Sequence, residues 1–555
     1  MDRIWYASYD PGVPHSVTYP ETTLPHILGE NSRRIPDRPA IDFMGAGLTY
    51  RELQNHVLRL AAGLRKIGVR QGSKVAVMLP NCPQTVIALF ASLHLGAVVI
   101  MTNPLYVEPE LEHQWTDSGA EFLFVLDHLY PAAKKVIPRT RIRKVIATSI
   151  SEYLPIHLRY LYPLKARSGK LFTSVPYNGT DIFNFRKILR TSFPDAAPCA
   201  ASPDELAFLQ YTGGTTGIAK GAMLTHRNIF TNVVQLATWL PDLNCGTERF
   251  LAVLPFFHVF GLTVSLNLAI YTGCAVIVVP RFHPDELMKI IKKRKPTIFP
   301  GVPAIYSALM AHPRIDSFDL SSIRFCVTGS APMPVEILRG FEQKTGATIV
   351  EGYGLSECSP VTHANPIHGK RKPGSIGLAL PDTDFRIVDV QTGERDVAPG
   401  EIGELVVRGP QQMKGYWNNE DETKAAVRNG WLFTGDLASM DESGYVFIVD
   451  RKKDLVISAG YNIYPRDIDE VLYAHPKVRD AAAVGVPDPI KGEVIKIFVV
   501  PKQGQELSRD EIREWCRQRL APYKQPKYIE FSDSLPKTLV GKVLRRELRR
   551  ESTEG

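Results

Sequence analysis

The chain has 555 residues, of which 44% are hydrophobic and 22% are charged, and its formal net charge is +8. These values are ordinary for a soluble globular protein and predict several structural units. Seven scattered cysteines without a CxxC pair argue against a disulfide framework or a zinc site and favour a reducing cytoplasm. The first 14 residues contain acids and prolines where an export signal needs an unbroken apolar segment.

From residue 48 the sequence alternates strand and helix patterns, which predicts a large N-terminal α/β domain with parallel sheets. We expect strands at 73–79, 97–101, 250–254, 274–279, 297–299, 325–328 and 348–351, and helices at 83–95, 108–118 and 284–294. Two apolar stretches, 85–101 and 260–280, are each interrupted by a glycine. A helix followed by a buried strand is therefore favoured over a membrane span in both.

The C-terminal part of the sequence has a different pattern. Short runs separated by Pro and Gly turns between 377 and 409 predict a small β-barrel-like part or an antiparallel sheet. After the charged segment 450–455, about a hundred residues carry their own strands and helices and predict a small α+β domain. We therefore expect an α/β fold with a large domain at 1–449, a linker at 450–455 and a small C-terminal domain at 456–555.

A glycine-rich loop at 211–221, YTGGTTGIAKG, has the composition of a phosphate-binding loop. Its glycines let main-chain N–H groups approach an anion, and its threonine hydroxyls and Lys220 add donors. A helix at 224–234, entered through Thr225, would direct its N-terminus to the same anion. The loop is not a P-loop, because alanine precedes Lys220 and glycine follows it where Ser or Thr is required.

A second glycine cluster, EGYGLSEC at 351–358, starts like a dinucleotide fingerprint. However, Glu357 stands where the third glycine belongs and would repel pyrophosphate. The cluster also misses the nucleophile elbow, because Glu357 and then Cys358 follow Ser356. Ser356 is therefore not expected to be an acyl nucleophile.

Between Lys134 and Lys170, ten basic residues are accompanied by a single acid, Glu152, and by several tyrosines and leucines. This mixture suits an anionic membrane surface. It suits a solvated, partly mobile insertion equally well. Nucleic acid is not expected as a partner, since no recognised binding motif accompanies the charge.

Five motifs occur in the order seen in acyl-adenylate-forming enzymes of the AMP-binding superfamily. They are the loop at 211–221, the cluster that begins at Glu351, WLFTGD at 431–436, DRKKD at 450–454 and PKTLVGK at 536–542. Within that superfamily the chain most resembles the bacterial long-chain fatty acid–CoA ligases. This closer resemblance includes NPLYVEPELEHQWTDSGA at 103–120 and LPFFHVFGL at 254–262.

The resemblance implies that ATP activates a long-chain fatty acid to acyl-AMP with release of pyrophosphate, and that coenzyme A then takes the acyl group. It implies a nucleotide site of Thr212, Gly213, Gly214, Thr215, Thr216 and Lys220 for the phosphates, Gly352, Tyr353 and Gly354 for adenine, and Asp436 and Arg451 for the ribose region. Glu357 and the Thr212 hydroxyl would hold magnesium, which suits hard oxygen ligands. Without the resemblance, Asp436 is typical of a turn and Arg451 of a solvated charge run.

The resemblance also assigns a catalytic role to Lys542, beside those of Glu357 and Thr212. It implies that Lys542 stabilises the charge that develops during adenylation, whereas a lysine in a basic tail otherwise faces solvent. The segment 450–455 would then be a hinge about which the mobile small domain swings.

Two further sites follow from the resemblance. Ser458, Ala459 and Gly460 match a segment that faces the coenzyme A tunnel, with Ala459 replacing a common glycine. His258 with Gly329, Ser330 and Ala331 would line the carboxylate and the acyl entry, although a histidine among aromatics is also typical of a core. An apolar tunnel would favour longer acids by about 0.8 kcal/mol per buried methylene.

Two alternative functions stay open. One keeps the chemistry but changes the acid or the acceptor: an aryl or short- or medium-chain acid–CoA ligase, or an acyl-AMP ligase that serves a carrier protein. The other is a non-catalytic nucleotide-binding, membrane-associated protein, against which the presence of Glu357, Asp436, Arg451 and Lys542 together argues. The expected partners are a fatty acid, ATP and coenzyme A, with a homodimer and transient membrane contact through 134–170 as further expectations. The expected location is the cytoplasm, with peripheral association at the inner membrane face as a variant.

Overall fold

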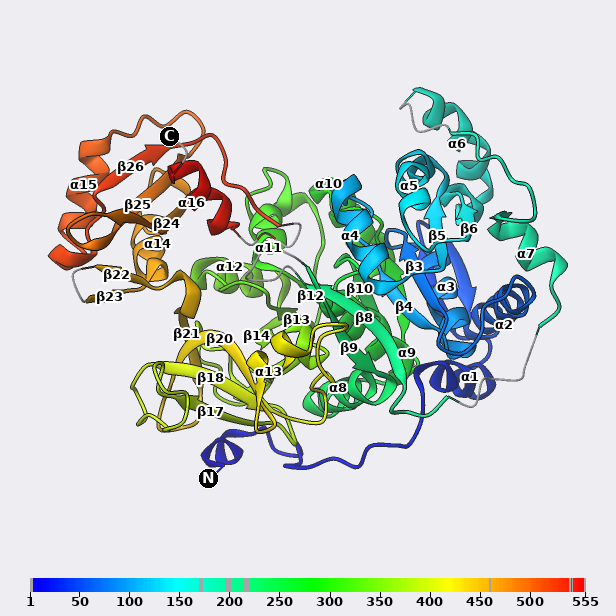
Figure 1. The fold of residues 1–555 in the computed structure, drawn as a ribbon, viewed down its shortest axis with the longest axis horizontal. Coiled ribbons are helices and arrows are strands. Elements are labelled where there is room, and N and C mark those ends of the chain that lie inside the picture. Colours follow the sequence, from blue (N-terminus) through cyan, green and yellow to red (C-terminus); the bar gives the residue numbers. More distant parts are fainter. Residues whose placement is uncertain are drawn as a thin grey trace.

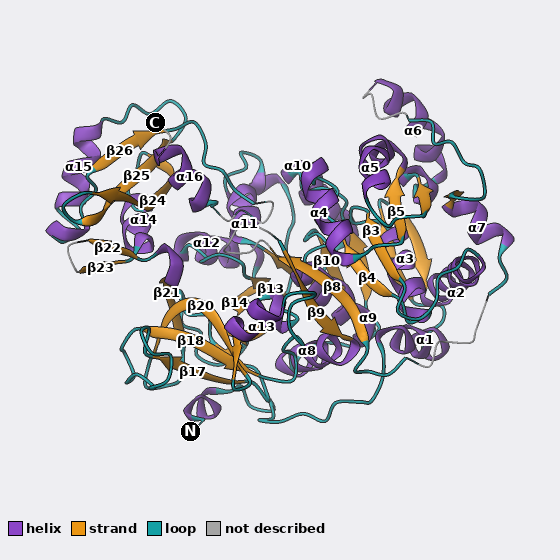
Figure 2. Ribbon diagram, in the orientation of Figure 1, coloured by secondary structure: helices purple, strands orange, loops and turns teal. Residues whose placement is uncertain are grey.

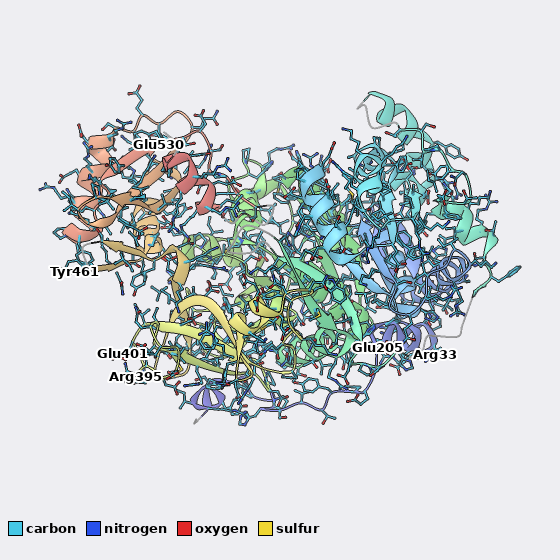
Figure 3. All side chains as sticks on the ribbon, viewed as in Figure 1. Arg33, Glu205, Arg395, Glu401, Tyr461 and Glu530 are labelled. Carbon is cyan, nitrogen blue, oxygen red and sulfur yellow. The ribbon has the colours of Figure 1, made fainter. Side chains whose placement is uncertain are left out.

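The computed structural model describes residues 3–168, 173–194, 201–212, 219–458, 461–538, 541 and 543–553. A large N-terminal part contains three sheets and a smaller C-terminal part contains a fourth (Figure 1). Side chains fill the space between the sheets and their helices (Figure 3). The hydrophobic clusters of the small part contain no residue before Val456, so this part has a core of its own.

The first sheet has seven strands, of which only the edge strand β9 runs antiparallel to its neighbour. Their order is β7 (Ile182–Asn184), β6 (Lys144–Thr148), β5 (Phe122–Leu126), β3 (Lys74–Met78), β4 (Val98–Met101), β8 (Leu206–Thr212) and β9 (Lys220–Thr225). The helices that precede or connect these strands are α2 (Tyr50–Lys66), α3 (Pro83–His94), α4 (Glu108–Ser118), α5 (Tyr130–Val136), α6 (Ile156–Ser168) and α7 (Phe185–Thr191). The short 3₁₀ helix η4 (Ile150–Tyr153) leads into α6.

The second sheet has nine strands with a parallel centre and antiparallel edges. Their order is β16 (Leu378–Ala379), β15 (Val361–Ala364), β14 (Thr348–Gly354), β13 (Phe325–Thr328), β12 (Ile298–Gly301), β10 (Arg249–Ala252), β11 (Ala275–Val278), β1 (Pro39–Phe43) and β2 (Ala46–Thr49). Its helices are α1 (Leu24–Arg34), α8 (His226–Trp239), the π-helix η5 (Gly261–Asn267), α9 (Leu268–Thr272), α10 (Pro284–Arg294), α11 (Pro303–Met310) and α12 (Val335–Thr345). The 3₁₀ helix η7 (Ser356–Cys358) follows β14.

The remaining strands form two smaller sheets (Figure 2). The third sheet is antiparallel and contains β17 (Asp384–Val388), β18 (Gly403–Arg408), β19 (Val427–Arg428), β20 (Trp431–Met440) and β21 (Val446–Arg451), with α13 (Glu420–Ala426) beside it. The C-terminal sheet contains β22 (Val456–Ser458), β23 (Tyr461–Ile463), β24 (Val478–Asp488), β25 (Gly492–Pro501) and β26 (Tyr528–Phe531), with α14 (Pro465–Tyr473), α15 (Arg509–Arg517) and α16 (Arg545–Thr553). The predicted fold class is thereby confirmed, while the domain boundaries at 449 and 456 stay predictions.

Both apolar stretches fold as a helix followed by a buried strand. Gly96 and Gly273 end the helices of the two stretches with φ values of 69° and 71°, a left-handed conformation that glycine adopts without strain. β4 and β11 follow and are buried. Among the described residues, no helix combines the length and the apolar character that crossing a bilayer requires.

The interpretation of 134–170 as an insertion is wrong, because β6 within it is an integral strand of the first sheet. Many of its basic side chains also have acidic partners from elsewhere in the chain. The pairs are Lys135 with Glu108, Arg139 with Glu112, Arg143 with Glu121 and Lys144 with Asp181. The segment is therefore less positive than its own composition indicates.

Candidate active site

The β8–β9 hairpin positions the glycine-rich loop. Thr212 ends β8 and pairs with Lys220, the first residue of β9, so the two residues face each other at the base of the loop. Four predicted phosphate-binding residues lie outside the described part of the chain, and their role stays a prediction. They are Gly213, Gly214, Thr215 and Thr216.

The predicted helix after the loop has the wrong start and the wrong position. Residues 220–225 form β9, and α8 begins only at His226. Thr225 does cap this helix, because its side chain accepts a hydrogen bond from the Asn228 N–H. However, Thr225 lies at the far end of β9 from Lys220, about 17 Å away at roughly 3.3 Å per residue. The N-terminus of α8 therefore does not face the phosphate loop.

Lys220 is held by two residues that the sequence analysis did not identify. Its Nζ lies 2.5 Å from Glu422 Oε2 and 5.4 Å from the centre of the Tyr416 ring. Tyr416 belongs to segment 413–417, whose backbone pairs with β9. Because these contacts join segments about two hundred residues apart, no local pattern in the sequence could have indicated them.

Glu357 lies in η7 and is tied to the same segment. Its Oε1 accepts a hydrogen bond of 2.7 Å from the Tyr416 hydroxyl, and its main-chain oxygen accepts one from the Met413 N–H. Burial, with the nearby Glu357 charge, raises the pKa of Tyr416 far above its usual value, so the hydroxyl remains a donor. Tyr416 thus connects the predicted magnesium ligand with the lysine of the loop.

The residues around Glu357 fit a magnesium ion that is bound mainly through substrate. Among the described residues, no group of three or more His, Cys, Asp or Glu could hold a metal by itself. Mg²⁺ commonly takes one or two protein carboxylates and completes its shell with water and substrate phosphates. Glu357 and the hydroxyl of Thr212 would supply such a partial set.

Tyr416→Phe is expected to raise the Mg²⁺ concentration for half-maximal adenylation by about five- to tenfold, because one hydrogen bond to a charged group is lost. The phenyl ring remains beneath Lys220, so the variant separates the hydroxyl from the ring contact. Magnesium titrations at saturating ATP measure the effect. Tyr19→Phe is the matched control, since Tyr19 also donates to a carboxylate, Asp382, at 2.7 Å but away from the site. An unchanged magnesium requirement in Tyr416→Phe would contradict the assignment.

Tyr353, Asp436 and Arg451 form one hydrogen-bonded cluster. The Tyr353 hydroxyl donates to Asp436 Oδ2 at 2.5 Å, and Arg451 Nε lies 2.7 Å from Asp436 Oδ1. The ion pair is fixed by the sheet, because β20 and β21 place Asp436 directly opposite Arg451. Asp436 is buried, so it is not a simple turn residue, and Arg451 is not a solvated charge. Burial raises the pKa of Tyr353 well above its usual value.

Glycines allow close packing at the carboxyl ends of β13 and β14. A Cβ atom at Gly354 would lie 2.0 Å from the main-chain oxygen of Pro360. One at Gly329 would lie 3.1 Å from the main-chain oxygen of Gly352 and 3.5 Å from the Phe260 ring. The packing therefore brings the segment after β13 against the aromatic segment around Phe260, as the resemblance implies for the acyl site.

The other predicted acyl-site residues lie in these two segments. Ser330 is exposed with a φ of 70°, Ala331 is half-buried, and His258 is half-buried beside Phe257. Burial lowers the pKa of His258 to about 4, so its imidazole is neutral at pH 7. A neutral imidazole can bind a carboxylate only as a hydrogen-bond donor and not as a counter-ion.

The small C-terminal part reaches the same edge of the second sheet. A Cβ at Gly541, the residue before Lys542, would lie 3.1 Å from Ala304 Cβ in α11, and the φ of 80° favours glycine there. α11 starts directly after β12, at the carboxyl edge that β13 and β14 share. The segment that carries Lys542 therefore contacts the large part beside the site, although Lys542 itself lies outside the described residues.

The predicted hinge and the predicted coenzyme A segment lie where the chain passes from the third sheet into the small C-terminal part. Asp450 accepts hydrogen bonds from the main-chain N–H groups of Arg451 and Arg466, at 2.7 and 2.8 Å. Ser458 is buried at the end of β22. Ala459 and Gly460 lie outside the described residues, so their role stays a prediction.

The sequence matches the family model for AMP-binding enzymes over residues 28–417 and that for the C-terminal domain of AMP-binding enzymes over residues 467–542. The chain belongs to the AMP-binding enzyme family. A curated relative of this AMP-binding enzyme, "Long-chain-fatty-acid--CoA ligase" of Bacillus subtilis, is 48% identical over 99% of the chain and 98% of the relative. A relative of the same name from Escherichia coli O157:H7 is 40% identical over 100% of the chain and 99% of the relative. A "Feruloyl-CoA synthase" of an Amycolatopsis species is 38% identical over 94% of the chain and 97% of the relative.

Solved structures indicate which arrangement of the two parts this AMP-binding enzyme has. ATP-bound MatB from Rhodopseudomonas palustris superimposes with a TM-score of 0.82 at 28% identity, covering 96% of this chain and 99% of that one. Apo MatB gives a TM-score of only 0.71 over the same coverage. The arrangement described here is therefore closer to the ATP-bound form of MatB than to its apo form.

Proposed function

We propose that the protein is a long-chain fatty acid–CoA ligase that forms acyl-AMP and pyrophosphate from ATP and then transfers the acyl group to coenzyme A, releasing AMP. The observation that carries the proposal is the convergence of Thr212, Lys220, Glu357 and the Tyr353–Asp436–Arg451 cluster in a chain that aligns end to end with curated ligases of that name.

In the adenylation step the fatty carboxylate attacks the α-phosphorus of ATP, and pyrophosphate leaves. The residues of the glycine-rich loop and Lys220 bind the phosphates and stabilise the charge that develops on their oxygens. Asp436 accepts hydrogen bonds from the ribose hydroxyls, and Arg451 holds Asp436 ionised and in place. Magnesium, bound by Glu357 and Thr212, would neutralise phosphate charge.

Lys220 must exchange its partner in this step. Lys220 is paired with Glu422, which satisfies an otherwise buried ammonium. The phosphates of ATP offer a stronger anionic partner, so binding would draw Lys220 from Glu422 toward the loop. Lys542 of the small domain would supply the second cation.

In the thioester step the thiol of coenzyme A attacks the acyl carbonyl, and AMP leaves. No protein nucleophile is needed, because the mixed anhydride is already activated. Rotation about 450–455 would remove Lys542 and bring the segment Ser458, Ala459 and Gly460 to the coenzyme A path.

A second candidate keeps this chemistry with an aryl acid, since a relative named as a feruloyl-CoA synthase is 38% identical. The neutral His258 and the small residues Gly329, Ser330 and Ala331 would contact either carboxylate. Exchange of radioactive pyrophosphate into ATP, with palmitate or ferulate as the acid, tests adenylation before any thiol enters. Palmitate-dependent exchange is expected, while exchange with neither acid would contradict the proposed function.

Two further features of the proposal are membrane contact and homodimer formation. The protein would act on amphipathic acids that partition into membranes, with transient contact through 134–170 at the inner face. Homodimer formation also stays a prediction, which sedimentation velocity tests.

A further inference from the structure

A cavity of about 550 Å³ lies far from the candidate active site, between α2, η4 and α7. Figure 1 shows α6 and α7 at one margin of the molecule and the small C-terminal part at the opposite margin. η4 and α7 follow β6 and β7, which are parallel neighbours, so both begin at the carboxyl edge of the first sheet. Ligands of open α/β sheets bind outside such an edge.

The lining of this cavity is rich in guanidinium groups. Arg59 of α2 and Arg186 and Arg190 of α7 line it, and no acidic partner is found for any of the three among the described residues. Arg59 is held in place, because its Nη1 donates to the main-chain oxygens of Leu189 and Ser192. Arg186 and Arg190 are exposed. Guanidinium groups that lack acidic partners at a concave surface are suited to bind phosphate.

One carboxyl group, Glu152, also lines the cavity. Burial raises its pKa to about 7, so it carries only part of a charge at neutral pH. Its Oε1 accepts a hydrogen bond from the Ser149 N–H, whereas its buried Oε2 has no hydrogen-bond partner. The Nδ1 atom of His56 shares a hydrogen bond with the Tyr153 hydroxyl. Burial lowers the pKa of His56, so its imidazole is neutral at pH 7. The arginines therefore dominate the charge of the cavity.

Large apolar side chains project into solvent on both sides of the cavity. On α6, which follows η4, Ile156, Tyr160 and Leu161 are 75%, 79% and 57% exposed. Phe193, just after α7, is 82% exposed. α6 is close to the cavity, because it begins three residues after η4, which lines the cavity, and it packs against η4. A soluble phosphate ligand would not require this apolar rim, whereas a bilayer would bury it.

We propose that the cavity binds the phosphate headgroup of an anionic phospholipid while Ile156, Tyr160, Leu161 and Phe193 insert into the membrane interface. The positive cavity and the apolar rim match the two components of a bilayer surface, phosphate and acyl chain. This site differs from the basic side chains of 134–144, which are largely ion-paired. Binding requires neither ATP nor an acid, so its test is independent of the proposed ligase activity.

Co-sedimentation of the full-length protein with vesicles tests the proposal. Vesicles of phosphatidylcholine with 30% phosphatidylglycerol are expected to bind the protein at least tenfold more tightly than vesicles of phosphatidylcholine alone. The double variant Arg186→Gln, Arg190→Gln should bind roughly 30-fold more weakly, at about fivefold for each basic residue. Lys187→Gln is the matched control, because Lys187 is exposed on the same helix but does not line the cavity, and it should change binding by less than about twofold.

A second pair of variants tests the apolar rim. Ile156→Ser with Tyr160→Ser should weaken binding about tenfold or more, whereas Ile490→Ser, at a position 91% exposed in the small part, should leave it unchanged. Thermal unfolding confirms that each variant is folded. Equal binding to both kinds of vesicle, or equal losses in Lys187→Gln and in the double variant Arg186→Gln, Arg190→Gln, would overturn the proposal. So would saturation of the cavity by inorganic phosphate in a protein that does not bind vesicles.

Discussion

Lys542→Ala is expected to slow acyl-AMP formation by roughly 100- to 1,000-fold, because one fixed cation at the developing charge is lost. Thioester formation from supplied acyl-AMP and coenzyme A should change by less than about threefold, since rotation about 450–455 would remove Lys542 from the site before that step. The contact of Gly541 with Ala304 supports this role, because it brings the PKTLVGK segment against the large part beside the site. Single-turnover measurements of the two half-reactions separate the effects.

Lys537→Ala is the control for this experiment. Lys537 lies in the same PKTLVGK segment, but its ammonium is ion-paired with Asp480 inside the small part. Its loss should affect the two half-reactions alike, through stability alone. If Lys542→Ala slowed both half-reactions equally, Lys542 would have a structural role and the assigned one would be wrong.

Asp436→Asn is expected to weaken ATP binding by about 30- to 100-fold, because the ribose loses a charged acceptor and Arg451 loses its partner in a buried ion pair. The more specific result concerns the sugar. The unmodified enzyme should bind ATP more tightly than 2′,3′-dideoxy-ATP, and Asp436→Asn should bind the two nucleotides equally. Calorimetric titration of the folded variant with both nucleotides measures this difference.

Asp384→Asn provides the matched control. Asp384 also forms carboxylate–guanidinium pairs, with Arg3 near the N-terminus at 2.8 Å and with Arg408 of the third sheet at 3.1 Å, but it lies outside the site. This variant should keep the preference for the complete ribose. Full retention of that preference in Asp436→Asn would show that Asp436 only supports the fold.

The sequence predicted most accurately what depends on neighbouring residues. The helix at 108–118 has the predicted bounds, and Thr225 caps a helix as expected. Only residues 224 and 225, predicted as the start of the helix, were misassigned, because their pairing with β8 outweighs their local helix pattern. Only tertiary contacts decide such a choice.

The parts of the site that escaped prediction all depend on distant contacts. Tyr416 and Glu422 reach Lys220 and Glu357 only because segment 413–417 pairs with β9. The ion pair of Asp436 with Arg451 arises from strand register, which the sequence does not display. The positive charge of segment 134–170 was similarly overestimated, since Lys135 and Arg143 form ion pairs with acidic residues outside that segment.

The most direct test of the central claim measures AMP and coenzyme A thioester together, with ATP and magnesium, across acids from acetate to oleate and a set of aryl acids. The account predicts equal amounts of both products. It also predicts that kcat/KM rises with chain length by up to about fourfold per methylene until the acyl site is filled. Products from aryl or short acids alone would contradict the long-chain assignment, and the absence of AMP with every acid would contradict the ligase itself.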